Sequence, residues 1–163
     1  MKALLTSTAV ALTLVLGAGP HAQQNPAIDE FNLAVEDART ILQAEHKLIV
    51  SQNLGLTAAE AEAFWPVYDA YAAELDKAGN RRVKLIADFA ASYGDLSDET
   101  AKQLVADMLK YQKEVLKIRD KYAKKFHRVL PGGKVVRFYQ IENKLDALVN
   151  FVLASEIPLV PVQ

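Results

Sequence analysis

The residue types that most often bind metals or transfer protons are thinly spread in this chain. It has three histidines and no cysteine, so thiolate chemistry and disulfide bonds are excluded. His46 and His127 stand on different predicted helices without a companion at metal-ligand spacing, so we expect hydrogen-bonding histidines rather than ligands. No glycine-rich phosphate loop, nucleophile elbow or HExxH motif occurs. We therefore expect no enzymatic activity, no metal and no cofactor.

A row of basic residues is the strongest candidate for a binding site. Lys110, Lys117 and Lys124 recur every seven residues, which places them on one side of a helix. The whole candidate surface for binding other proteins is Lys110, Lys113, Lys117, Lys121, Lys124, Arg128 and the aromatic Phe126. Such a surface attracts acidic or unfolded chains at long range, and apolar contact follows. Nucleic acid would suit the charge, but the leader-like pattern of residues 1–22, described below, predicts export, and an exported protein rarely meets nucleic acid, so we expect none.

A second interpretation of the basic row comes from the segregation of charge along the chain. Residues 23–76 hold ten acids and two bases, whereas residues 77–144 hold sixteen bases and eight acids. In an antiparallel arrangement, acids of the first stretch would lie alongside Lys113 to Arg128. These acids are Glu60, Glu62, Asp69, Glu74 and Asp76. The basic row would then form ion pairs between helices instead of binding a partner, and the sequence leaves both interpretations open.

Two heptad patterns must position these residues. The first consists of Phe64, Tyr68, Tyr71, Leu75, Ala78, Arg82, Leu85 and Phe89, and the second of Leu104, Met108, Tyr111, Val115, Ile118 and Tyr122. Alternating spacings of three and four keep one seam facing a partner helix. Because only a short turn at Gly94-Asp95 separates the patterns, we expect an antiparallel hairpin. In this hairpin Tyr71, Leu75 and Leu85 should be buried against Met108, Val115 and Ile118.

Two further helices should flank the hairpin. The sequence predicts helices from Asn25 to Gly55, from Thr57 to Ser92, from Ser97 to Leu130 and from Lys134 to Ser155, followed by an extended tail over residues 157–163. Thr57 with Glu60 forms a capping box, and Ser97 caps the third helix. The fourth helix should bury Val135, Phe138, Ile141, Leu145, Leu148 and Val152. Its polar residues Gln140, Glu142, Asn143 and Lys144 should face solvent. The predicted fold is all-α, an elongated antiparallel hairpin with flanking N- and C-terminal helices.

The first 22 residues have the pattern of a secretory signal peptide. Lys2 provides the positive start, residues 3–16 are apolar, and small residues follow at Gly17-Ala18-Gly19 and Pro20-His21-Ala22. We expect cleavage, leaving residues 23–163 as a single helical domain that is periplasmic or secreted and not stably inserted in a membrane. The alternative is an uncleaved membrane anchor, although the apolar run is short for one.

Two short motifs add a family resemblance. Leu56-Thr57-Ala58-Ala59-Glu60 and Leu96-Ser97-Asp98-Glu99-Thr100 each stand at the start of a long predicted helix. The chain thereby resembles the Spy/CpxP-like periplasmic proteins, envelope-stress chaperones and signalling modulators with a twice-occurring LTxxQ motif. Glutamate and threonine replace the family's glutamine here. The resemblance covers roughly residues 57–130 and implies structural roles for Leu56, Thr57, Leu96 and Ser97.

The resemblance implies a thin, curved helical homodimer that binds non-native proteins on its concave side without ATP. We therefore expect an exported protein-binding protein, an ATP-independent periplasmic chaperone or envelope-stress factor. The alternative is a structural or signalling adaptor that docks on one folded partner. Genuine chaperone activity would suppress aggregation of several unrelated proteins, whereas an adaptor would ignore them.

Overall fold

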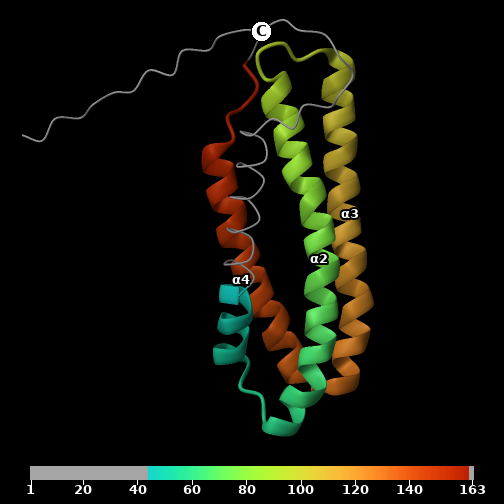
Figure 1. The fold of residues 1–163 in the computed structure, drawn as a ribbon, viewed down its shortest axis with the longest axis vertical. Helices are drawn as coiled ribbons and strands as arrows, with labels where there is room; N and C mark the ends of the chain where they lie inside the picture. Colours follow the sequence, from blue (N-terminus) through green and yellow to red (C-terminus); the bar gives the residue numbers. More distant parts are fainter. Residues whose placement is uncertain (1–43, 162–163) are drawn as a thin grey trace, which may run out of the picture. The chain divides into compact units, whose positions relative to one another are not determined.

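The computed structural model describes residues 44–161, which belong to the compact unit formed by residues 42–163. Residues 44–54 are helical, and α2 (Ala58–Ser92), α3 (Asp98–Val129) and α4 (Gly132–Glu156) follow (Figure 1). No strand occurs among the described residues. The predicted all-α, four-helix fold is therefore confirmed. The expected leader and the expected start of the first helix lie outside the described residues.

Local hydrogen bonds at the helix starts explain why the boundaries could be read so closely. The backbone N–H of Glu60 donates to the Thr57 hydroxyl at 3.3 Å, and the Thr57 N–H donates to the Glu60 carboxylate at 2.7 Å. This is the reciprocal capping box that the sequence predicted. Ser97 accepts from the N–H of Thr100 at 3.2 Å. Gly55, with φ of +64°, ends the first helical segment in a conformation that few other residues adopt without strain.

The helices α2 and α3 run antiparallel side by side, and their lower halves pack with α4 around one aromatic cluster (Figure 1). Phe126 of α3 and Phe138 of α4 have ring centroids 4.6 Å apart, and Phe64 of α2 lies 5.4 Å from Phe126. Val50 and Leu54 of the first helical segment are buried in the same core. Aromatic rings from α2, α3 and α4 thus stabilise this end of the bundle, and the first helical segment adds two aliphatic side chains.

The buried core extends along only part of the hairpin. Every buried residue of α2 lies at or before Ala78, and every buried residue of α3 at or after Ile118. Tyr71 and Ile118 are buried as predicted, but Met108, expected in the seam, is 40% exposed. Leu75, Leu85 and Val115 are only partly buried. The same seam pattern therefore packs tightly at one end and loosely at the other.

The fourth helix differs from its prediction in three respects. It begins at Gly132 rather than Lys134, because Leu130 is extended and the carbonyl of Pro131 already accepts from the N–H of Lys134 at 2.9 Å. Leu148 and Val152, expected to be buried, are 64% and 56% exposed. Glu142, expected to face solvent, is buried instead. The non-helical tail after Glu156 is confirmed as far as residue 161.

One contact fixes the tail to the hairpin turn. The Tyr93 hydroxyl donates to the carbonyl of Leu159 at 3.1 Å. Among the described helices, none is both long enough and apolar enough to cross a membrane.

Candidate functional site

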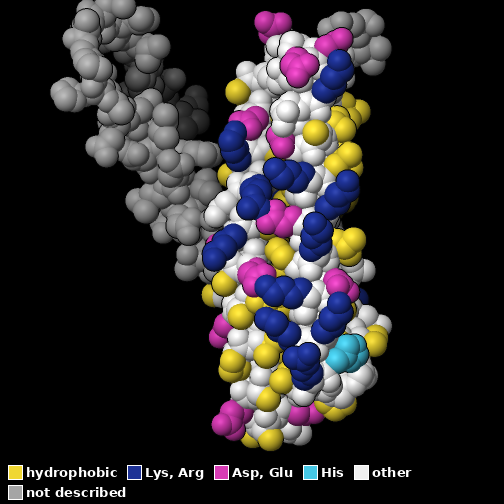
Figure 2. All heavy atoms as spheres, turned by 90° about the vertical axis from the view of Figure 1, so that its right-hand side faces the viewer, with side chains coloured by type: hydrophobic (Ala, Val, Ile, Leu, Met, Phe, Trp, Pro, Cys, Tyr) yellow, Lys and Arg dark blue, Asp and Glu magenta, His cyan; other side chains and the backbone are white. Residues whose placement is uncertain are grey.

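Three of the predicted basic residues lie together on the open side of the hairpin. Lys110, Lys113 and Lys117 are exposed on α3 and form no hydrogen bond or ion pair with any other described residue. Figure 2 shows the side of the molecule where α3 lies, with lysine and arginine side chains running along it and fewer acidic side chains between them. These lysines are available to an anionic partner.

The remaining members of the predicted row differ in their surroundings. Lys121 donates to both carboxylate oxygens of Glu74 on α2, at 2.6 and 2.9 Å. Lys124 donates to Asp120 one turn away on its own helix at 3.1 Å. Arg128 is exposed and has no partner among residues 44–161. The interpretation as interhelical ion pairs thus applies to Lys121 and does not extend along the row.

Phe126 was wrongly assigned to the binding surface. Its side chain is 0% exposed and lies in the centre of the aromatic cluster. Spacings of four residues from Ile118 through Tyr122 to Phe126 place Phe126 on the buried side of α3 rather than beside the lysines. A residue in this position can support the fold but cannot contact a partner.

The register of the hairpin decides which charges meet. Glu74 pairs with Lys121, Arg81 pairs with Glu114, and Phe64 lies 5.4 Å from Phe126, so the first half of α2 lies alongside the second half of α3. Residues 77–84 of α2 consequently face residues 110–118 of α3. Together these two stretches contain seven bases and one acid, Glu114. Of the α2 bases, Arg81 pairs with Glu114, Arg82 donates to Asn150 of α4, and Lys84 pairs with Asp88 on its own helix.

A groove between α2 and α3 follows this stretch and has a volume of about 700 Å³. Its lining is Arg81, Ala106, Leu109, Lys110, Lys113, Glu114 and Lys117. The side chains of Arg81 and Glu114 are 56% and 31% exposed, so water reaches their ion pair. Chemically, the groove offers three unpaired ammonium groups and one exchangeable guanidinium to a negatively charged ligand.

Apolar side chains border the lysines. Val105, Leu109 and Leu116 are 54%, 44% and 67% exposed, and their spacings of four and seven residues align them along one side of α3. We call this strip and the lysines beside it the basic-apolar face. Its members are Val105, Leu109, Lys110, Lys113, Leu116 and Lys117. The face can therefore combine charge attraction with apolar contact.

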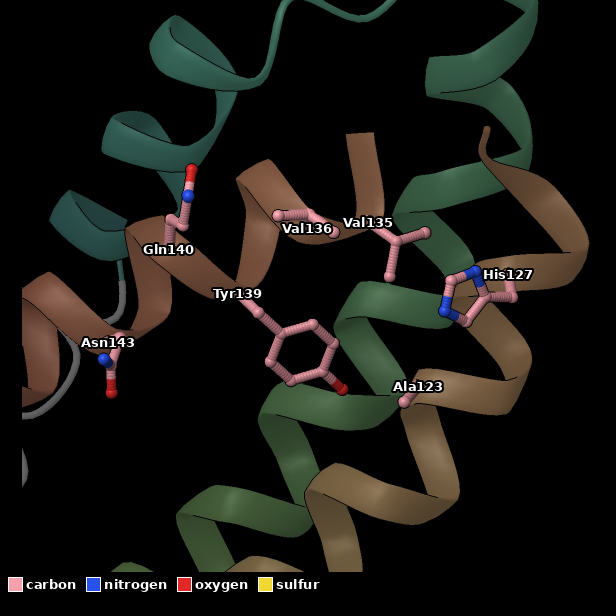
Figure 3. A pocket seen from close by; sticks show the side chains of 7 residues that line it. All are labelled: Ala123, His127, Val135, Val136, Tyr139, Gln140 and Asn143. Carbon is pink, nitrogen blue, oxygen red and sulfur yellow. The ribbon is translucent and has the colours of Figure 1, made fainter. Parts of the chain in front are cut away.

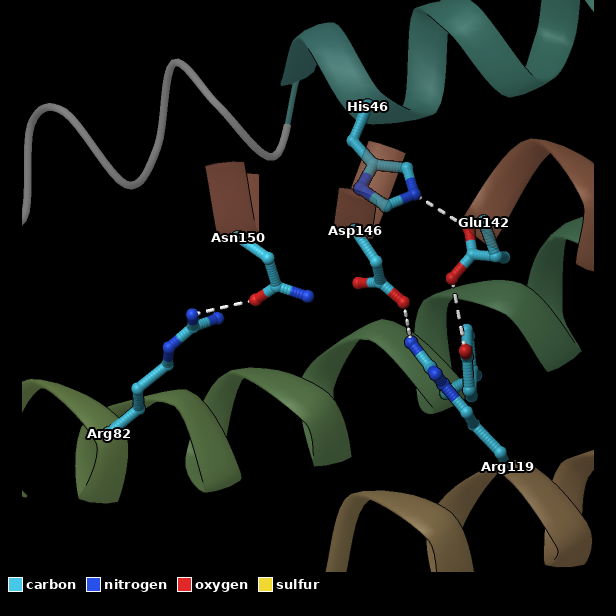
Figure 4. Close-up of polar contacts among 7 residues, drawn as sticks. His46, Arg82, Arg119, Glu142, Asp146 and Asn150 are labelled. Carbon is cyan, nitrogen blue, oxygen red and sulfur yellow. Dashed lines mark hydrogen bonds and ion pairs between the residues drawn. The ribbon is translucent and has the colours of Figure 1, made fainter. Parts of the chain in front are cut away.

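A second polar cluster lies inside the bundle and was missed in the sequence. The carboxylate of Glu142, 3% exposed, accepts from the Tyr71 hydroxyl at 2.9 Å and lies 2.6 Å from Nε2 of His46 (Figure 4). It joins the first helical segment, α2 and α4. The signal was the series Val135, Phe138, Glu142 and Leu145, whose spacings of three, four and three put the glutamate on the seam.

Neighbouring polar groups pair in the same region, and the pKa values of its tyrosines are raised. Burial and the negative charge of Glu142 raise the pKa of the Tyr71 hydroxyl well above its usual value. The same two causes raise the pKa of Tyr139 to about 12. Arg119 pairs with Asp146, and Arg82 donates to Asn150 at 2.7 Å (Figure 4). The tyrosines therefore remain neutral donors at ordinary pH, which suits support of the fold.

His127 borders a shallow pocket of about 430 Å³ between α3 and α4 (Figure 3). Tyr139 lies in this pocket, and its hydroxyl donates to the carbonyl of Arg119 at 2.8 Å. Gln140 and Asn143 contribute the other polar groups. Within residues 44–161, no three His, Cys, Asp or Glu side chains gather closely enough to hold a metal ion.

The motif residues have local structural positions. Thr57 and Ser97 are the N-caps of α2 and α3. Leu56 packs against the core, and Leu96 is partly buried in the turn. Comparison with known protein families, with characterised proteins and with solved structures finds no match to this chain.

Proposed function

We propose that this protein binds other proteins, as an ATP-independent chaperone or envelope-stress factor acting on exported, non-native chains. The observation that supports this best is the basic-apolar face, where Lys110, Lys113 and Lys117 have no partner among the described residues and lie beside Leu109 and Leu116. Non-native chains expose charged and apolar groups together, so such a face can hold them without requiring one fixed shape.

The two components of the face have different physical roles. The lysines act over the Debye length of roughly 8–10 Å and favour encounter with acidic chains. The leucines act only on contact, when apolar surface is removed from water. Binding of this kind needs no nucleotide. The proposed periplasmic or secreted location follows from the leader expected at residues 1–22.

The decisive experiment measures suppression of aggregation for several unrelated unfolding proteins, using the mature chain and the double variant Leu109→Gln with Leu116→Gln. Both leucines are exposed, and glutamine keeps a similar helix propensity. The variant should retain its fold, seen by circular dichroism, and lose most of its suppression. Leu148→Gln is the matched control, because Leu148 is equally exposed on α4 and lies outside the face.

Equal loss in the control would contradict the assignment to α3. Failure of the unaltered protein to suppress aggregation of any of these proteins would contradict the chaperone function.

The second candidate is an adaptor that docks on one folded partner. The observation in its favour is the Arg81–Glu114 pair, which gives the groove a defined arrangement of charge. An adaptor would leave the unrelated proteins to aggregate and would bind a single partner at a fixed stoichiometry.

A further inference from the structure

The middle of the hairpin gathers positive charges, whereas the lower part of the hairpin pairs opposite charges. Lower in the hairpin Glu74 pairs with Lys121, whereas higher up Arg81 of α2 lines one groove together with Lys110, Lys113 and Lys117 of α3. Lys77 lies one turn before Arg81 on the same side of α2, whereas Lys84, one turn after it, is paired with Asp88 at 2.6 Å. The described lining of the groove thus holds four cations and a single carboxylate, and this excess of positive charge favours a ligand that neutralises it.

Glu114 is the one acid in this groove. Its carboxylate forms an ion pair with the guanidinium of Arg81, and both groups remain accessible to water. A ligand carboxylate can replace Glu114 at Arg81, because the N–H groups of the guanidinium donate to either carboxylate with the same geometry. Glu114 therefore competes with an incoming acidic group for the same site.

We propose that the groove between α2 and α3 binds acidic segments of client proteins, and that a client carboxylate displaces Glu114 from Arg81. This inference rests on the proposed function and names the class of chain that the basic-apolar face selects. Leu109 and Ala106 in the lining favour a polypeptide over a purely ionic polymer, since a polypeptide supplies apolar side chains to cover them.

The spacing of the cations specifies the spacing of the ligand's charges. Lys113 and Lys117 are one helical turn apart, a rise of about 6 Å. Acidic residues at every second position of an extended chain are about 7 Å apart, so their carboxylates can meet successive lysines. Acidic residues alternating with apolar or small ones therefore form the preferred segment.

The experiment measures binding of labelled peptides to the full mature chain by fluorescence anisotropy. One peptide has glutamate at every second position among serine and leucine residues, and a matched peptide has glutamine in place of glutamate. We expect the acidic peptide to bind at least about tenfold more tightly, with an affinity that falls as salt rises. Inorganic polyphosphate is the third probe.

Glu114→Gln is the informative variant, because it removes the competitor and keeps the shape of the side chain. It should tighten binding of the acidic peptide about three- to tenfold. Arg81→Gln should weaken that binding by a similar factor. Lys144→Gln removes one positive charge from an exposed position on α4 and should leave binding unchanged.

Unchanged or weaker binding by Glu114→Gln, or equal binding of the two peptides, would overturn the proposal. Binding of polyphosphate without the acidic peptide would overturn it too, and would make the groove a general polyanion site. The aggregation assay separates this failure from that of the proposed function. Clients would still be protected if only the groove assignment is wrong, and would not be protected if the chaperone function is wrong.

Discussion

At the scale of single residues, Glu142 is the one buried charged side chain among those that the structure describes. It accepts hydrogen bonds from side chains that are 71 and 96 residues away in the sequence. A buried carboxylate is costly unless it is fully hydrogen-bonded, and here Tyr71 and His46 provide the bonds. Glu142 therefore helps to specify which faces of the first helical segment, α2 and α4 meet.

Replacing Glu142 by alanine should destabilise the protein by about 1–3 kcal/mol, because the buried Tyr71 hydroxyl loses its acceptor. Urea unfolding monitored by circular dichroism measures this change. Tyr71→Phe is the matched variant and should cost only about 1 kcal/mol, since it removes the donor and leaves Glu142 its contact with His46. A Glu142→Ala protein as stable as the wild type would show that the cluster contributes nothing.

At the scale of elements, a single lysine joins the beginnings of two helices. Lys134 in the first turn of α4 pairs with Glu60 in the first turn of α2, and also donates to the carbonyl of Gly55 at 2.8 Å. The hydrogen bond from Lys134, with the backbone N–H of Thr57, lowers the pKa of Glu60 from 4.5 to about 2. The hydrogen bonds from Lys121 and Tyr122 also lower the pKa of Glu74.

These lowered values predict loss of stability in acid. The folded-state pKa of Glu60 lies below its unfolded value, so its contribution is complete above pH 4.5 and is lost as the pH falls towards about 2. Glu60→Gln should therefore be less stable than wild type at neutral pH and should lose less stability over that acidic range. Urea midpoints at several pH values measure the difference.

Glu62→Gln is the control for this acid prediction, because Glu62 is exposed on the same helix and has no partner among residues 44–161. It should follow the wild-type pH dependence. Parallel wild-type and Glu60→Gln curves would contradict the proposed role of the Lys134 contact.

At the scale of the whole described bundle, packing and charge change together along α2 and α3. The aromatic cluster and the ion pair of Glu74 with Lys121 occupy one half, whereas the other half has a loose seam and a groove lined mainly by cations. A surface that is selected for binding commonly retains such unfavourable features, because relieving them would remove the ligand's partners. The division separates a stabilising half from a binding half.

Lys113→Glu should therefore stabilise the protein and abolish its binding of acidic segments. The new carboxylate lies one turn before Lys117 on α3 and faces the α2 cations, which should contribute about 0.5 kcal/mol and raise the Tm slightly. Lys144→Glu makes the same charge change away from the hairpin and should do neither. A lower Tm for Lys113→Glu in a folded protein would argue that the lysine already has a structural partner.

The sequence by itself determined where α2 and α3 begin. Thr57 and Ser97 act through hydrogen bonds to residues three positions away, so their effect is visible in a short stretch of sequence. The short turn after Ser92 likewise required α2 and α3 to be antiparallel. The lysines of the candidate site could be found because their spacing is also a local property.

Only the tertiary structure decided the register, and the register decided the site. The heptad pattern shows which residues lie on the seam, but it does not show which individual side chains meet across the three helices. Packing of Phe64, Phe126 and Phe138 from three helices fixes the choice. That choice places Arg81 beside Glu114 and brings Glu142 to the buried hydroxyl of Tyr71. These contacts join residues far apart in the chain, and long-range packing alone determines them.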